Sequence, residues 1–204
     1  MPSQPNPPMD LVVSGATADR ILDVAERLAQ TRGFNAFSYA DIATELGLSK
    51  AALHYHFPTK ADLGEALITR YTSRFAGALE EIDGGRADAP TCLRAYVELY
   101  ASVLAEDRMC LCGVLAADYD TLPESMQRKV IGFFDLNETW LSALLERGLA
   151  EGSLRCAGSP DDHAKLMVGA LEGAMLVART YHDGQRFSGA ADRLLAELWP
   201  PADG

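Results

Sequence analysis

Apolar residues recur every three or four positions along most of the chain, which places them on one face of an α-helix. Two clear runs are Leu93, Tyr96, Val97 and Tyr100, and then Trp140, Leu141, Leu144, Leu145 and Leu149. No segment alternates apolar and polar residues as a half-buried strand does, and no Asn-Gly or Asp-Gly turn joins two β-branched segments. The pattern therefore predicts an all-α fold with about nine helices.

Capping residues and helix breakers predict where these helices begin and end. The first four are expected from Thr17 to Gly33, from Ser38 to Gly47, from Ser49 to Pro58 and from Thr59 to Glu81. The other five are expected over about 90–106, 109–118, 123–151, 160–181 and 187–199. These ends leave residues 1–16, which begin with a proline-rich stretch, as an arm expected to be disordered.

The net charge of −11 excludes one broad class of function. A protein that binds nucleic acid over its whole surface is basic. The acidic charge is concentrated in the larger part of the chain, since residues 1–62 hold five Lys and Arg against seven Asp and Glu, whereas residues 63–204 hold 13 against 22. A short element near the N-terminus can therefore dock on DNA while an acidic body stays clear of it.

Composition favours a globular protein of the cytoplasm. Hydrophobic residues make up 48% of the 204 residues and charged residues 23%, which is typical of a folded chain. The apolar stretches are shorter than the roughly 20 residues that a membrane span needs, and the N-terminus lacks the pattern of a signal peptide. Because four cysteines are too few for a disulfide framework, we expect a reducing compartment and no membrane contact.

Residues 38–57 have the pattern of two short helices joined at Gly47. Two such helices that cross at about 90–120° need a small residue where their backbones meet and a turn residue that tolerates positive φ. Ala43, four residues before Gly47, supplies the first, and apolar residues flank the turn on both sides. The spacing predicts a helix-turn-helix whose second helix, Lys50–Phe57, enters the DNA major groove by its N-terminal end.

The motif continues as His54-Tyr55-His56-Phe57-Pro58-Thr59-Lys60, and over about residues 17–65 the chain resembles the DNA-binding domain of TetR/AcrR-family transcriptional regulators. The resemblance implies a three-helix DNA-binding domain over 17–62 and an all-helical ligand-binding and dimerisation domain over 63–204. It also implies a regulator, by default a repressor, that binds double-stranded operator DNA and responds to a small-molecule effector.

The resemblance assigns the DNA contacts to residues on and around the recognition helix. The expected contacts are Ser38, Thr44, Lys50, Ala51, Ala52, His54, Tyr55, His56 and Lys60. Alanine permits close approach to the groove and to a thymine methyl, although Ala51 and Ala52 are also good helix formers and His56 has the alternative of packing inward. Because one domain offers few cations, two copies on a pseudo-palindromic operator are expected, as a homodimer.

A dense group of aromatic and sulfur side chains between residues 90 and 151 suits the wall of a small-molecule pocket. The candidate ligand contacts are Tyr96, Tyr100, Cys110, Cys112, Tyr119, Phe133 and Trp140. Cys110-Leu111-Cys112-Gly113 resembles a segment of family members that respond to reactive electrophiles, and a helix N-terminus there lowers a thiol pKa. The alternative is that these cysteines pack as small hydrophobic residues.

Neither a metal nor a cofactor is expected, because no second pair of closely spaced ligands accompanies Cys110 and Cys112; only the distant His163 or His182 is available. The last two helices are expected to form the homodimer interface. Small residues on the first and apolar residues on the second support this interface, namely Gly169, Ala170, Gly173, Ala174 and Ala178, and Leu194, Leu195, Leu198 and Trp199. The alternative is that the small residues pack within one subunit.

Two rival functions use other features of the sequence. An all-α enzyme would use His163 or His182 with Glu172 or Asp183, but it lacks a recognisable catalytic constellation and leaves the helix-turn-helix unexplained. The second rival is a helical ligand-binding protein that has lost DNA binding. A gel shift with DNA distinguishes it from a regulator. We therefore expect a regulator and not an enzyme. The sequence identifies neither effector nor operator, and it does not separate repression from activation.

Overall fold

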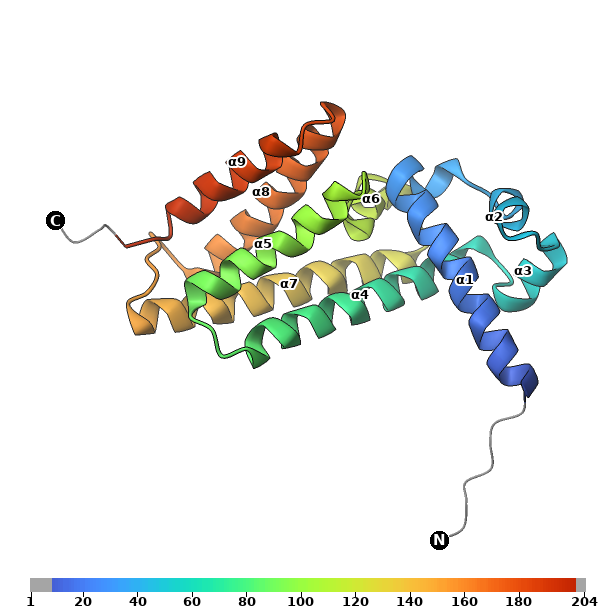
Figure 1. Cartoon of the computed structure of the whole chain (residues 1–204), viewed down its shortest axis with the longest axis horizontal. Coiled ribbons are helices and arrows are strands. Elements are labelled where there is room, and N and C mark those ends of the chain that lie inside the picture. Colours follow the sequence, from blue (N-terminus) through green and yellow to red (C-terminus); the bar gives the residue numbers. More distant parts are fainter. Residues whose placement is uncertain (1–8, 201–204) are drawn as a thin grey trace, which may run out of the picture.

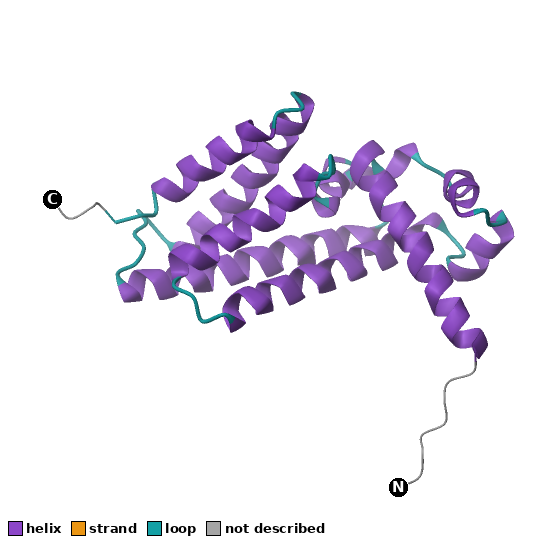
Figure 2. Ribbon diagram, viewed as in Figure 1, coloured by secondary structure: helices purple, strands orange, loops and turns teal. Residues whose placement is uncertain are grey.

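The structure, a computed structural model, describes residues 9–200, with side chains from residue 15 onward. Within that range it is built from helices without a strand (Figures 1 and 2). The α-helices are α1 (Met9–Arg32), α2 (Tyr39–Leu46), α3 (Lys50–His56), α4 (Lys60–Gly84), α5 (Ala89–Ala105), α6 (Leu111–Ala117), α7 (Glu124–Glu151), α8 (Pro160–Thr180) and α9 (Gly184–Ala196). Two short 3-10 helices, Phe34–Ala36 and Tyr119–Thr121, complete the order. The prediction of an all-α fold is confirmed.

The predicted helix ends lie within three residues of those in the structure, except at the start of the first helix. Helix α1 begins at Met9, so Thr17 lies inside it, and residues 9–16 of the expected disordered arm are helical. The physical reason is that the nearest upstream breaker is Pro8, directly before the first helical residue. Residues 1–8 of that arm lie outside the described residues. The capping residues Ser38, Ser49 and Thr59 each precede a helix as predicted.

Helices α1, α2 and α3 form a small unit at one end of the molecule (Figure 1). Its core is made by apolar side chains that are almost completely buried, among them Ile21, Ala25, Phe34, Ile42 and Leu53. Helix α4 begins beside this unit and runs into the larger domain, where it packs against α7. Helix α3 is therefore connected through α4 to the longest helices of the larger domain.

The larger domain is a layered bundle around α7. Helices α4, α5, α6 and α8 all pack against α7, while α9 packs on α8 and α5 (Figure 1). Asn137 is a polar side chain that this core buries completely. The hydroxyl of Tyr96 donates to Asn137 Oδ1 at 2.8 Å, and Asn137 Nδ2 donates to the Phe133 carbonyl at 2.8 Å. The hydrogen bond between Tyr96 on α5 and Asn137 on α7 fixes the register of these two helices. Across residues 9–200 none of the helices has the length and hydropathy that a bilayer crossing requires.

Candidate DNA-binding surface and effector groove

The turn between α2 and α3 has the geometry that the sequence predicts. Gly47 adopts a left-handed conformation with φ 66° and ψ 31°, and its backbone N–H donates to the Ala43 carbonyl. A Cβ is disfavoured in this region, so glycine is the residue that allows the sharp turn. Helix α3 is capped by Ser49, whose side chain accepts from the Ala52 N–H at 3.1 Å, and Leu53 anchors it in the core.

Tyr39 holds the other end of α3, and sequence reasoning missed it. Its hydroxyl lies 2.7 Å from the carbonyl oxygens of both Phe57 and Thr59, the residues between α3 and α4. Its ring lies against His54, with 4.7 Å between ring centroids. Burial, and then the nearby carboxylate of Asp62, raises the pKa of Tyr39 to about 12. The buried phenol therefore stays neutral and ties the recognition helix to α4.

Replacing Tyr39 with Phe should lower the free energy of unfolding by about 1–2 kcal/mol, because the two carbonyl groups lose their shared donor in a poorly solvated site. Chemical denaturation at one protein concentration measures the change. The matched control is Tyr55→Phe, since the Tyr55 hydroxyl makes no hydrogen bond to any residue that the structure describes and its side chain is 79% exposed. Equal stabilities of the two variants would contradict this role of Tyr39.

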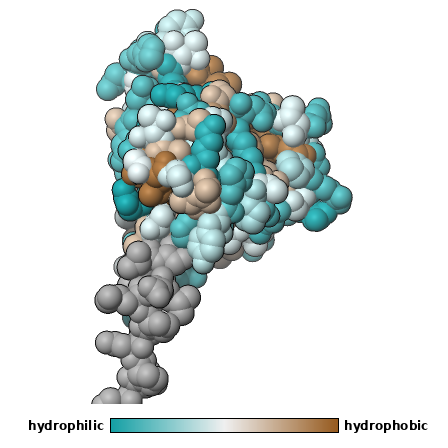
Figure 3. All heavy atoms as spheres, turned by 90° about the vertical axis from the view of Figure 1, so that its right-hand side faces the viewer, coloured by the Kyte–Doolittle hydropathy of each residue, from teal (hydrophilic) through white to brown (hydrophobic). Residues whose placement is uncertain are grey.

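The nine predicted DNA contacts lie together around α3, and most are open to solvent. Six are exposed, namely Ser38, Thr44, Lys50, Ala51, His54 and Tyr55. Ala52 and His56 are half-buried, and the His56 ring meets the edge of the Tyr55 ring. Figure 3 looks at this end of the molecule and shows a mainly polar surface with small apolar areas. Four of the nine, Ser38, Lys50, His54 and Lys60, line one shallow pocket, and the contacts of all nine with DNA stay predictions.

Lys60 is the member of this group that the structure treats differently. Its Nζ donates to the Phe37 carbonyl at 2.5 Å and lies over the rings of Phe34 and Phe37. Burial lowers the pKa of Lys60. The ammonium is thus held within the DNA-binding unit, an arrangement that does not favour a phosphate contact. The other lysine of the motif, Lys50, is exposed and in no ion pair within the described range.

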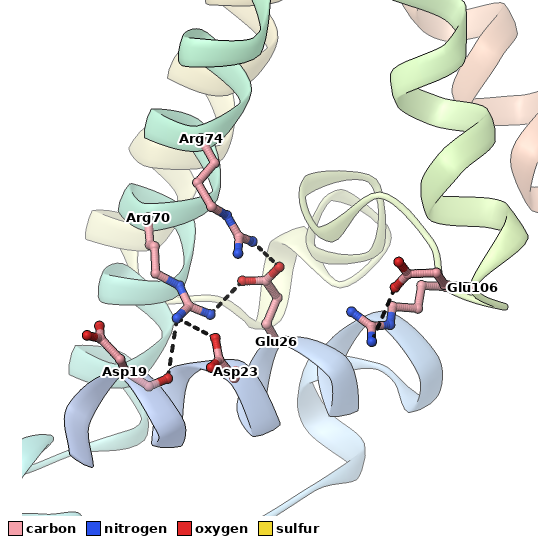
Figure 4. A network of polar contacts seen from close by, with 7 residues as sticks. Asp19, Asp23, Glu26, Arg70, Arg74 and Glu106 are labelled. Carbon is pink, nitrogen blue, oxygen red and sulfur yellow. Dashed lines mark hydrogen bonds and ion pairs between the residues drawn. The ribbon is translucent and has the colours of Figure 1, made fainter. Parts of the chain in front are cut away.

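An ion-pair network joins α1 to α4 (Figure 4). Glu26 on α1 is 6% exposed, and its two carboxylate oxygens pair with Arg70, at 2.8 Å, and with Arg74 on α4. Arg70 also pairs with Asp23 at 2.7 Å and donates to the Asp19 carbonyl at 3.3 Å. This network fixes the angle between the DNA-binding unit and the first helix of the effector domain.

A second link reaches α1 from α8. Arg179 donates to the carbonyl oxygens of Gln30, at 3.1 Å, and Thr31, at 2.5 Å, in the last turn of α1. Those carbonyls have no partner within the helix, and a cationic donor there also complements the negative end of the helix dipole. The end of α1 that leads into the helix-turn-helix is therefore attached to the effector domain on two sides.

The aromatic and sulfur residues predicted to contact a ligand are mostly core residues. Tyr96, Tyr100, Cys110, Cys112 and Phe133 are almost fully buried, while Tyr119 and Trp140 are half-buried. Tyr96 stacks on Trp140 with 5.5 Å between ring centroids, and the Trp140 indole N–H donates to Asp83 at 2.8 Å. Ligand contact by these seven residues stays a prediction, and this packed arrangement does not favour it.

A groove of about 640 Å³ lies elsewhere, between the end of α1 and helices α6, α7 and α8. We call it the effector groove. None of the seven predicted ligand contacts lines it. Its wall, over the described residues, consists of Thr31, Arg32, Gly33, Met109, Gly113, Val114, Ala116, Ala117, Asp118, Phe134, Glu138, Lys165, Val168, Gly169, Glu172, Gly173, Leu176 and Arg179. Sequence reasoning missed it because glycine and alanine create much of its space.

Of the two alternatives for Cys110, the structure favours a buried small hydrophobic residue over an activated thiol. Cys110 caps α6, where the helix N-terminus favours a thiolate, and its Sγ accepts from the Gly113 N–H at 3.5 Å. Burial, and then the neighbouring Glu172 carboxylate, nevertheless raise the pKa of this thiol well above its ordinary value. The same two causes raise the pKa of Cys112. Desolvation and a like charge outweigh the helix N-terminus, so both groups are neutral thiols.

The outer faces of α8 and α9 border a second, smaller groove of about 360 Å³. Ala170 and Ala174 of the predicted small-residue stripe line it, but Gly169 and Gly173 line the effector groove and Ala178 is buried. The small residues of the stripe therefore lie on two different faces of α8. Large apolar side chains that are exposed along α8 are Leu166, Leu176 and Val177, with Tyr181 directly after it.

Within residues 15–200 no group of three or more His, Cys, Asp or Glu is placed to hold a metal ion.

Comparison with known proteins supplies two family matches. Residues 21–67 match the family of bacterial regulatory proteins described as the tetR family, and residues 89–194 match a tetracyclin repressor-like C-terminal domain. The first match covers the helix-turn-helix and the start of α4, and the second covers α5 through most of α9. Residues 68–88, which include most of α4, lie between the two matches.

Named relatives are similar over most of the chain. The transcriptional regulator AcuR of Cereibacter sphaeroides is 28% identical over 153 residues, which are 72% of this chain and 69% of AcuR. The nucleoid occlusion factor SlmA of Photobacterium profundum is 29% identical over 157 residues, 74% of this chain and 78% of SlmA. A crystal structure of a TetR-family transcriptional regulator from Agrobacterium tumefaciens has a TM-score of 0.89 at 33% identity, and the match covers 92% of this chain and 100% of that one.

Proposed function

The chain belongs to the TetR family of bacterial regulatory proteins and is a DNA-binding transcriptional regulator, not an enzyme; from this premise we propose that it represses transcription as a homodimer that a small-molecule effector releases from a pseudo-palindromic operator. The observation that carries the proposal is the exposed recognition helix. Helix α3 presents Lys50, Ala51 and Tyr55 to solvent while Leu53 and Tyr39 fix it from behind. A rigid exposed helix of this kind fits a major groove.

Homodimerisation through α8 and α9 is supported by the apolar side chains that these helices leave uncovered. Leu166 and Val177 are 58% and 48% exposed, and the groove between the two helices is lined mainly by alanine and leucine. Apolar patches of this kind mark interaction sites. A dimer would carry two recognition helices, and each would read one half of the operator.

Release by an effector is supported by the position of the effector groove. Thr31 and Gly33, at the junction of α1 with the helix-turn-helix, form part of its wall. A ligand that binds only one orientation of that junction shifts the population toward it. Because both thiols are buried and have raised pKa values, a noncovalent effector is supported over an electrophile. The proposed site of action is the cytoplasm, where the chromosome lies.

Operator binding tests the proposal. In a gel shift with the intergenic DNA upstream of its own gene, the protein should form a specific complex whose affinity falls steeply with salt. Lys50→Ala and Tyr55→Ala should each weaken it by about tenfold, since a dimer loses two contacts. Light scattering should give the mass of two chains. Arg155→Ala, an exposed cation in the loop between α7 and α8, is the matched control.

The opposite outcome has a definite meaning. Absent binding, or binding that does not depend on salt, would favour the rival function of a helical ligand-binding protein without DNA binding. Equal losses in Lys50→Ala and Arg155→Ala would show that the contact is general electrostatics and not groove recognition by α3.

A further inference from the structure

The effector groove contains a carboxylate whose charge is not balanced by a neighbouring side chain. Glu172 lines the groove from α8, and its Oε1 is shielded from solvent without a hydrogen-bond partner among the described residues. The Cys110 thiol bonds to the same carboxylate from α6. Glu172 belongs to no ion pair across residues 15–200. An ionised carboxyl in this position would gain from a bound cation, and the described side chains place none against it.

The space for this carboxylate is built into α6. Gly113 faces Glu172, and a Cβ at position 113 would clash with the carboxylate oxygens. Gly169 and Gly173, on either side of Glu172 along α8, keep the adjacent wall open. The apolar part of the wall comes from Val114, Phe134, Val168 and Leu176. The groove thus combines an acidic point with apolar sides.

Two of the three cations in the wall, Lys165 and Arg179, are already engaged by other groups. Lys165 Nζ lies 2.7 Å from Asp161 Oδ2, outside the groove lining. Arg179 donates to the two carbonyls at the end of α1 and lies 4.0 Å from Asp107. Arg32 is exposed. A second acid, Glu138, faces the groove from α7 without an ion pair in the described structure. The described wall thus holds one unpaired cation, Arg32, and three unpaired acids, Asp118, Glu138 and Glu172, so its balance is negative.

We propose that the effector groove binds a small organic cation with an apolar body, and that Glu172 is the counter-ion of its ammonium group. The inference rests on the proposed function, because it names the chemical class of the effector. The apolar body would lie along Val114, Phe134 and Leu176, while Glu138 would add a second negative charge. A volume of about 640 Å³ suits a molecule of this class.

Such a ligand would act on the DNA-binding unit through a short path. Glu172 and Arg179 lie seven residues apart on α8, which is about two helical turns on the same face. Arg179 holds the last carbonyls of α1, and Thr31 and Gly33 line the groove. A cation paired with Glu172 raises the positive potential near Arg179 and fills the space beside α1. The occupied groove would then favour a different orientation of α1.

Calorimetric titration of the full chain with 4-phenylbutylamine and 4-phenylbutanol tests the proposal, since the two probes have the same size and differ in charge. We expect the amine to bind at least about tenfold more tightly than the alcohol at pH 8. Glu172→Gln should remove the preference for the amine, and Glu146→Gln, an exposed acid on α7, should leave it unchanged.

The wild-type protein offers a second readout that needs no variant. Burial raises the pKa of Glu172 to about 7. The affinity of the protein for the amine should therefore fall by about tenfold from pH 8 to pH 6, because the Glu172 carboxyl takes up a proton. The other titratable or charged groups around this carboxyl are Tyr71 from α4, Tyr96 and Tyr100 from α5, Cys110, Cys112 and Asp118 from α6 and its end, Glu138 from α7, Lys165 and Arg179 from α8, and Arg32 from α1. The thiols and phenols among them have raised pKa values and stay neutral over this range.

Three results would overturn the inference: equal affinities for amine and alcohol, an unchanged preference in Glu172→Gln, or an affinity for the amine that does not vary between pH 6 and pH 8. If neither probe binds while the protein still binds its operator, the cation site is refuted and the proposed function stands. If operator binding itself is absent, the proposed function fails, and the titration then reports on the groove alone.

Discussion

Replacing Glu26 with alanine is expected to lower the free energy of unfolding by about 3–5 kcal/mol, the cost of removing one partner from a buried ion pair. The Glu26 carboxylate, 7% exposed, is shared by Arg70 and Arg74 (Figure 4). Its loss leaves the guanidinium of Arg70, which is only 20% exposed, with the exposed Asp23 as its remaining acidic partner. The Arg70 Nε already lacks a partner among the described residues, so the loss of Glu26 would leave a second nitrogen of this guanidinium, Nη2, unpaired.

Urea denaturation at a fixed protein concentration measures this loss, because a dimer's apparent stability depends on concentration. Asp23→Ala is the matched control: it removes a carboxylate from the same arginine, but that side chain is 65% exposed, and the expected loss is below about 1 kcal/mol. If Glu26→Ala and Asp23→Ala cost the same, the network stabilises the junction of α1 and α4 far less than its burial implies.

The fold could be predicted from local signals because each of them acts within a few residues. Gly47 marks a turn through its own backbone conformation, and Ser159 before Pro160 starts α8 where the sequence indicates. The start of α1 was misplaced for the same local reason. Thr17 is a good capping residue, but nothing between Pro8 and Thr17 stops a helix, so the helix continues through it.

The site was harder to predict because its properties depend on which helices meet. The space of the effector groove comes from glycine and alanine on α6 and α8, and absent side chains give no pattern in a sequence. In the sequence, Glu172 appeared only beside a histidine in the rejected enzyme, because its surroundings in the groove depend on Gly113, almost 60 residues earlier. Similarly, the amine of Lys60 is held away from solvent by its contacts with Phe34 and Phe37, and two helices separate these residues from Lys60 in the sequence.

Glu172 also makes the stability of the protein depend on pH. Burial raises its pKa from 4.5 to about 7, so the folded state holds a proton that the unfolded state has already released. Stability is therefore greatest below about pH 4.5 with respect to this group, and it falls as pH rises to about 7, above which both states are ionised. At about 1.4 kcal/mol per pKa unit the full loss is about 3 kcal/mol, and partial exposure of the side chain reduces it to about 2 kcal/mol.

Glu172→Gln removes the titrating group and keeps the shape of the side chain, so the variant should gain about 2 kcal/mol over the wild type between pH 4.5 and pH 8. The difference between the two unfolding free energies cancels the titration of every other group. Glu146→Gln, an exposed acid, should stay within about 0.5 kcal/mol of the wild type throughout. A difference that is constant with pH would mean that Glu172 is already ionised at low pH, and a groove with a permanently solvated carboxylate would have no need of a bound cation.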